Sequence, residues 1–135
     1  MTATPKLMLV EHDPYFIYLI KLYAEQSGFS VITTTSGVGA LAMAQREHPS
    51  VIILEFELPE INGWEVLNQL RAEPRTQAIP VVMCLWQDSQ YVEGDCEGLL
   101  HKPLDYGDFV AALKVAGVWP PDWPSDHRRL PPTEP

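Results

Sequence analysis

Three apolar runs of this chain end on or beside a charged side chain that could take part in chemistry. Glu11 ends the run KLMLVE, Glu55 follows VIIL, and Lys102 follows GLLH. A carboxylate that meets an ammonium group can form an ion pair. Carboxylates together with the imidazole of His12 could instead bind a transition metal such as Zn²⁺ or Mn²⁺. Which chemistry is available depends on whether the fold brings these side chains together.

The apolar runs have the length and composition of buried strands. Strands are predicted over residues 6–11, 29–34, 51–54, 81–85 and 98–101. The run VIIL is apolar throughout, which is typical of a strand that is covered on both faces. Helical periodicity fills most of the intervals between these runs.

Start and stop signals mark the predicted helices. Asp13 as cap, followed by Pro14, predicts a first helix that ends at Ser27–Gly28. Three more helices are predicted, from the cap Ser36 to about Glu47, from the cap Asn62 to about Ala72, and after the cap Asp105. Only 12 residues, 86–97, separate the fourth and fifth strands, so a helix there is expected to be short or absent.

Strands that alternate with helices in this way form a parallel sheet with helices on both faces. In such sheets, ligands and chemistry gather at the carboxyl ends of the strands. The residues at or just after those ends are therefore the candidate site: Glu11, His12, Glu55, Leu85 and Lys102.

Composition limits the possible functions. The chain has 135 residues, 46% of them hydrophobic, which predicts one globular domain. Its 18 acidic and 9 basic residues give a formal charge of −9, which disfavours nucleic acid or an anionic membrane as a partner. No apolar run reaches the roughly 20 residues of a membrane span, and the start is not a signal peptide. Two lone cysteines favour free thiols in a reducing cytoplasm.

Several segments resemble the receiver domain of bacterial two-component response regulators. ELPEINGWEVLNQLRAEPRTQAIPVVM is similar to the family's third strand, loop and third helix, and MLVEHDP is similar to its first strand. The dipeptide Lys102–Pro103 after a short strand is the third matching feature. The resemblance covers about residues 6–117. It implies a flavodoxin-like (CheY-like) three-layer α/β sandwich with five parallel strands in the order 2-1-3-4-5.

The resemblance also implies roles for the candidate residues. In the family, an aspartate at the position of Glu55 accepts a phosphoryl group, and two acids at the positions of Glu11 and His12 hold Mg²⁺. A Ser or Thr at the position of Leu85 binds the phosphoryl oxygens, and Lys102 matches the family's lysine. Leu99 stands at a second switch position. Glu55, His12 and Leu85 all depart from the pattern.

These departures predict a degenerate receiver that is not an enzyme, accepts no phosphate, needs no cofactor and binds Mg²⁺ weakly or not at all. Glu55 is expected to pair with Lys102, either as a fixed ion pair or as a permanent mimic of the phosphorylated state. Two alternatives stay open. The chain could be an active receiver that uses Glu55 as its acceptor, or a metal- or flavin-binding α/β protein.

The chain is expected to act in signalling through protein contacts, as a stand-alone cytoplasmic domain. Its expected partner is a sensor kinase, a receptor or a regulator, and a homodimer is a further possibility. Trp86 is expected to cap the pocket or to bind a partner. Residues 1–118 form the predicted domain and 119–135 a tail in which six of the last 17 residues are proline. Trp119 and Trp123 in this tail are further partner-binding candidates.

Overall fold

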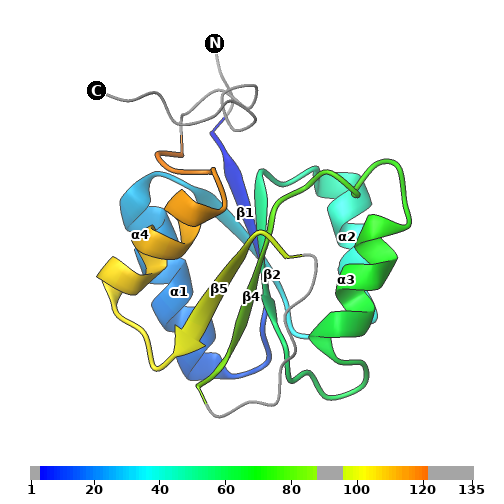
Figure 1. The fold of residues 1–135 in the computed structure, drawn as a ribbon, viewed down its shortest axis with the longest axis horizontal. Coiled ribbons are helices and arrows are strands. Elements are labelled where there is room, and N and C mark those ends of the chain that lie inside the picture. The colour runs from blue at the N-terminus through cyan, green and yellow to red at the C-terminus, as the bar shows by residue number, and fades with distance from the viewer. Residues whose placement is uncertain (1–3, 88–95, 122–135) are drawn as a thin grey trace.

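A five-stranded parallel sheet forms the middle layer of the part of the chain that the structure describes, with helices on both of its faces (Figure 1). The computed structural model describes residues 4–87 and 96–121. The strands are β1 (Lys6–Val10), β2 (Ser30–Thr34), β3 (Val51–Glu55), β4 (Val81–Trp86) and β5 (Gly98–Lys102). The helices are α1 (Pro14–Ser27), α2 (Ala40–Glu47), α3 (Gly63–Arg71) and α4 (Tyr106–Val115).

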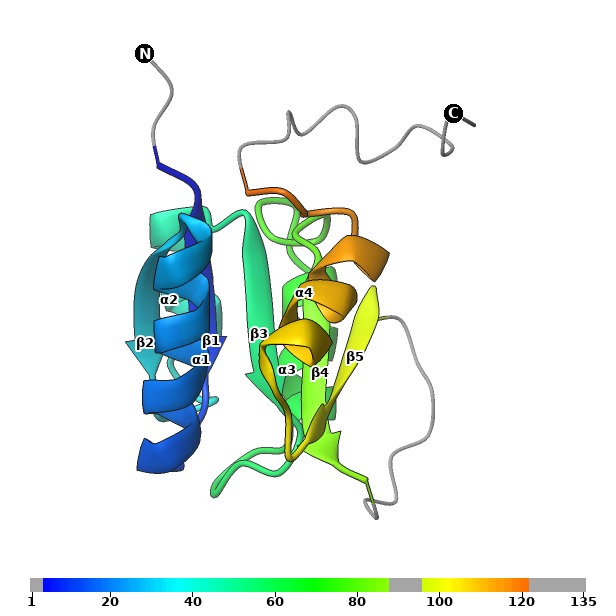
Figure 2. The same ribbon diagram turned by 90° about the vertical axis from the view of Figure 1, so that its left-hand side faces the viewer.

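The strand order is β2-β1-β3-β4-β5, and all neighbouring pairs are parallel. This order confirms the predicted flavodoxin-like fold. Figure 2 shows the strands side by side, with their carboxyl ends together at one end of the sheet. The first and last described residues lie at the opposite end (Figure 2).

Alternation along the strands divides the core into two clusters, one on each face of the sheet. Leu9, Ile53 and Leu100 pack toward α1 and α4 in the first cluster. Val10, Leu54 and Met83 pack toward α2 and α3 in the second. Because β1, β3 and β4 are covered on both faces, nearly every residue in them is buried, which explains why their sequences lack polar alternation.

Most predicted helix boundaries agree with the structure. Asp13 caps α1 by accepting a hydrogen bond from the Tyr15 N–H, and Gly28 ends the helix with a positive φ of 106°. Asn62 caps α3. In α4, Asp105 and Asp108 form a reciprocal capping box. These caps fix the turns that follow β1, β3 and β5.

The prediction that Ser36 caps the second helix is wrong. The helix begins at Ala40, and its N-cap is Gly39, which has no side-chain cap hydrogen bond. The Ser36 hydroxyl instead accepts a hydrogen bond from the Val38 N–H. Ser36 thus closes a local turn before the helix, a role that serines also favour.

The predicted shortening or absence of a helix between β4 and β5 falls largely on residues 88–95, which lie outside the described residues. No helix in the described ranges, 4–87 and 96–121, is long and apolar enough to cross a membrane.

Candidate functional site

The carboxyl ends of β1, β3 and β5 bring two acids and a lysine together. Glu55 is the last residue of β3, Lys102 is the last residue of β5, and Glu11 directly follows β1. Within their strands, Glu55 and Lys102 are two residues beyond Ile53 and Leu100, which face α1 and α4. The two-residue repeat of a strand therefore points both charged side chains toward α1.

Glu11, Glu55 and Lys102 form a buried ion-pair cluster. Their exposed fractions are only 1%, 2% and 2%. The Lys102 Nζ lies 2.8 Å from Glu11 Oε1 and donates a hydrogen bond to Glu55 Oε1. The predicted pairing of Glu55 with Lys102 is therefore present, with Glu11 as a second partner.

Backbone N–H groups hold the remaining carboxylate oxygens. Glu11 Oε2 accepts hydrogen bonds from the N–H groups of His12 and Asp13, at 3.0 and 3.1 Å. Glu55 Oε2 accepts one from the Glu57 N–H at 3.0 Å. Glu11 Oε1 is buried and is paired with the Lys102 ammonium at 2.8 Å.

Two aromatic rings cover the ammonium of Lys102. Its Nζ lies 4.2 Å from the centroid of the Phe16 ring and 5.7 Å from that of Trp86. The two rings meet edge to face, with centroids 5.5 Å apart. The indole of Trp86 remains 40% exposed, so it partly covers the cluster and also faces solvent.

Burial and charge shift the pKa values of Glu55 and Lys102. Loss of solvent raises the pKa of Glu55, and this effect outweighs the opposing hydrogen bond from Lys102. Burial would lower the pKa of Lys102, but its interactions with the carboxylates of Glu11 and Glu55 raise the pKa overall. Lys102 therefore stays protonated, and the cluster holds one positive charge between two carboxyl groups.

Cys84 is a buried thiol on β4 that is electrostatically coupled to this cluster. Burial raises the pKa of its thiol. The thiol is therefore protonated at neutral pH, which makes Cys84 a packing residue and not a nucleophile.

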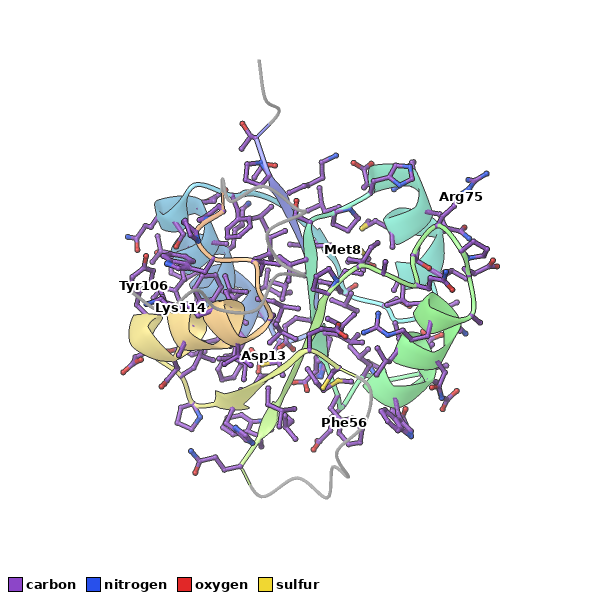
Figure 3. The ribbon with its side chains drawn as sticks, turned by 45° about the horizontal axis from the view of Figure 1, so that its top comes forward. Met8, Asp13, Phe56, Arg75, Tyr106 and Lys114 are labelled. Carbon is purple, nitrogen blue, oxygen red and sulfur yellow. The ribbon has the colours of Figure 1, made fainter. Side chains whose placement is uncertain are left out.

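A hollow of about 450 Å³ lies at the solvent side of the cluster. Its lining residues are His12, Asp13, Glu55, Glu57, Leu58, Pro59, Trp86 and Lys102. Asp13 and Phe56, both labelled in Figure 3, belong to the turns that follow β1 and β3 at this end of the sheet. The structure thus brings His12 and Trp86 next to the charged cluster.

Other predicted site residues lie apart from this hollow. Leu85 is buried and packs in the core cluster beside α2 and α3. Leu99 is 38% exposed and lines a second hollow together with His101 and Val115. Trp119 packs against the core cluster beside α1 and α4, and Trp123 lies outside the described residues.

Sequence reasoning missed the ring of Phe16 and the N–H groups that hold the two acids. Helical periodicity predicts that Phe16 is buried, but not that its ring lies against an ammonium. The N–H donors of Asp13 and Glu57 carry no side-chain signal, because any residue supplies a backbone N–H. Among the described residues, no group of three or more His, Cys, Asp and Glu side chains could hold a metal ion.

Comparisons with known proteins agree with this architecture. Residues 7–114 match the family model described as the response regulator receiver domain. The polar-differentiation response regulator DivK of Brucella ovis is 31% identical over 116 residues, which span 82% of this chain and 94% of that protein.

Solved structures give the same picture. The bacteriophytochrome response regulator RtBRR is 31% identical with a TM-score of 0.75, over 87% of this chain and 80% of that one. The chemotaxis response regulator CheY4 of Vibrio cholerae is similar in fold, with a TM-score of 0.78 and 24% identity, over 84% of this chain and 99% of that one.

Proposed function

This chain belongs to the family of response regulator receiver domains, and we propose that it takes part in signalling through protein contacts without accepting a phosphoryl group at Glu55. Family membership makes it a two-component signalling domain, and the proposal concerns how this particular member works. The observation that carries the proposal is the buried ion pair between Lys102 and both Glu11 and Glu55.

The state of Glu55 argues against phosphoryl transfer. Its two oxygens accept hydrogen bonds from the Lys102 ammonium and the Glu57 N–H, and its side chain is one methylene longer than that of aspartate, so its carboxylate is positioned differently from the family's acceptor. Phosphoryl transfer depends on positioning and on groups that stabilise charge on the transferred oxygens. Leu85, at the end of β4, has no hydroxyl to provide such stabilisation, and its side chain packs in the core.

The donor set also supports weak binding of Mg²⁺ or none. Mg²⁺ requires several oxygen ligands in octahedral geometry. Glu11 and Glu55 direct oxygens at Lys102 and at backbone N–H groups, and His12 offers an imidazole where the family has an acid. We therefore derive no role for a metal ion in the function of this domain.

Signalling would then depend on the surface that the domain presents. The partner is a signalling protein such as a sensor kinase, a receptor or a regulator, and a homodimer is compatible with this function. The cluster could act as a constant negative group that resembles a phosphorylated receiver, or only as a fixed support for the carboxyl end of the sheet. Both versions predict a domain without enzymatic turnover.

Phosphoryl mimics test the proposal directly. We expect no thermal stabilisation of the protein by beryllofluoride with Mg²⁺, and no mass increase after incubation with acetyl phosphate. The triple variant Glu55→Asp, His12→Asp and Leu85→Thr restores the family's residue types and serves as the control that should gain stabilisation. A phosphoryl group on Glu55 of the unchanged protein, lost in Glu55→Gln, would overturn the proposal.

A further inference from the structure

The strand β2 forms one edge of the sheet and differs from the rest of the molecule in its lack of charge. Figure 2 shows it at the rim of the sheet, where β1 is its one neighbouring strand among the described residues. It lies within residues 26–45, the longest stretch of the chain without Asp, Glu, Lys, Arg or His, although 20% of the chain is charged. Proteins commonly protect an exposed strand edge with charged side chains or proline, because an open edge can pair with another strand. The strand β2 contains neither.

Alternate backbone groups of β2 point away from the sheet. The Ser30 N–H donates to a carbonyl just before β1, and the Thr34 carbonyl accepts from the N–H just after β1. By the alternation of a strand, the N–H and C=O groups of Val31 and Thr33 then point to the open edge. Among the described residues, no hydrogen bond reaches these outward groups. The edge therefore offers two donors and two acceptors to another strand.

The side chains of β2 also suit a paired strand. Thr33 is exposed, and Val31 and Ile32 are only partly buried, each at the margin of one core cluster. All three are β-branched, the type of side chain that packs well against the neighbours of a pleated surface. A partner strand would cover these side chains and satisfy the outward backbone groups at the same time.

A second copy of this chain is the partner that fits the edge. Each copy carries a formal charge of −9, so two copies repel one another where their charged surfaces meet. At β2 no charged side chain would stand opposite a like charge, which destabilises paired strands elsewhere. The other edge strand, β5, contains His101 and Lys102. An uncharged edge offers no ion pair to a charged partner, whereas an identical strand matches both its hydrogen bonds and its apolar side chains.

We propose that two copies of this chain pair through β2, with the strands antiparallel about a two-fold axis at Ile32. Val31 of each copy then exchanges both backbone hydrogen bonds with Thr33 of the other, and the two Ile32 side chains pack together. The two five-stranded sheets become one continuous sheet. The inference rests on the proposed function, because it makes a second copy one of the protein contacts through which the domain signals.

Analytical ultracentrifugation of the full chain over a range of protein concentrations tests the pairing. We expect a monomer of 15.2 kDa that converts to a dimer as the concentration rises. Thr33→Pro removes an outward N–H and no hydrogen bond within the copy, so it should weaken dimerisation about tenfold or more and leave the fold intact. Thr33→Lys adds a protecting charge and should weaken dimerisation to a similar extent. Thr33→Val keeps the N–H and the strand propensity, and this matched control should dimerise like the unchanged protein.

Disulfide formation tests the register of the two strands. The Cα atoms of the two Ile32 residues would lie about 4.5 Å apart, as in other antiparallel pairs without hydrogen bonds, and a disulfide spans about 4.4–6.8 Å. Ile32→Cys should therefore form a covalent dimer under mild oxidation. Ser30→Cys is the control, since its two copies would lie about 14 Å apart along the strands. Both variants are made together with Cys96→Ser, because the Cys96 thiol is partly exposed.

Three results would reject pairing through β2. They are a monomer at every concentration, a dimer that neither Thr33→Lys nor a folded Thr33→Pro weakens, and a Ser30→Cys protein that crosslinks as fast as Ile32→Cys. A thermal shift measured with beryllofluoride and Mg²⁺ on the same preparation keeps the two proposals separate. A monomer without a thermal shift rejects only the pairing, whereas a thermal shift rejects the proposed function and leaves the pairing to the ultracentrifugation.

Discussion

Lys102 allows two carboxyl groups to lie inside the protein at the carboxyl end of the sheet. Each of the three side chains is at least 98% buried, and burying a charge without a partner costs several kcal/mol. Burial of the carboxyl group is the main reason that the pKa of Glu55 is raised, and the neighbouring carboxylate of Glu11 raises it further. The cluster is therefore a source of pH-dependent stability.

Glu55→Gln should become more stable relative to the unchanged protein as pH rises from about 4 to 7. Because the folded pKa of Glu55 is raised, its contribution to the free energy of unfolding is fully present below the unfolded pKa. That contribution is lost as pH rises through the folded pKa. The change in the free energy of unfolding grows with the difference between the folded and unfolded pKa values of Glu55.

Urea unfolding of both proteins at a series of pH values measures this difference. If the free energy of unfolding falls with urea concentration at the same slope in both proteins, their unfolded states are comparable. A difference between the proteins that stays flat, or that falls as pH rises, would contradict the raised pKa of Glu55.

The sequence predicted the members of the cluster better than their geometry. Glu11, Glu55 and Lys102 could be selected because strand ends meet at one edge of a parallel sheet. Their contacts could not be derived in the same way, because the length and direction of side chains decide them. The sequence thus indicated that Lys102 would meet Glu55, but not that it would also meet Glu11 and the ring of Phe16.

At the scale of elements, the start of α3 is tied closely to the end of β3, which carries Glu55. The Gly63 N–H donates to the Phe56 carbonyl at 2.7 Å. A Cβ at Gly63 would lie 2.7 Å from the Glu55 carbonyl oxygen and 2.9 Å from the Cα of Phe56. Only glycine permits this close approach, so Gly63 helps to set the position of the candidate site.

Gly63→Ala should destabilise the protein by about 1–3 kcal/mol, because the added methyl group meets backbone atoms that cannot move freely. Helix propensity alone predicts the opposite, a gain of up to about 1 kcal/mol. Gly39→Ala, where a Cβ meets nothing within 4 Å, is the control and should change stability by less than about 0.5 kcal/mol. Denaturant unfolding measures the stability of both variants. Equal effects of Gly63→Ala and Gly39→Ala would contradict the close approach of Gly63 to the backbone at the end of β3.

Element boundaries show where sequence signals suffice and where they do not. The capped starts of α1, α3 and α4 were predicted, since their Asp or Asn caps have specific backbone partners. The start of α2 was misplaced, because Ser36 stabilises a turn as readily as a helix and Gly39 provides the N-cap without a side chain. Tertiary packing of Ala40 and Ala44 then decides where this helix lies.

At the scale of the whole molecule, the charged cluster and the last described residues lie at opposite ends of the sheet. Trp119 packs on the core beside α1 and α4, and it lines a hollow with Pro5 and Gly28 near the amino end of the sheet. The boundary after residue 118 and the stand-alone character of the domain stay predictions. The position of Trp119 indicates that residues just beyond this boundary contribute to the fold.

Trp119→Ala in the full chain should lower the free energy of unfolding by about 1–3 kcal/mol, because a large apolar side chain loses its contacts with the core. Val115→Ala on α4 is a matched control, since Val115 is 75% exposed and should contribute less than about 0.5 kcal/mol. Thermal and urea unfolding measure the free energy of unfolding of both variants.

The outcome decides where the domain ends in energetic terms. If Trp119→Ala were as mild as Val115→Ala, residue 119 would belong to the tail, as the sequence-based boundary predicts. A large loss would extend the domain through Trp119, and in that case removing residues 119–121 should destabilise the protein at least as much as the substitution does.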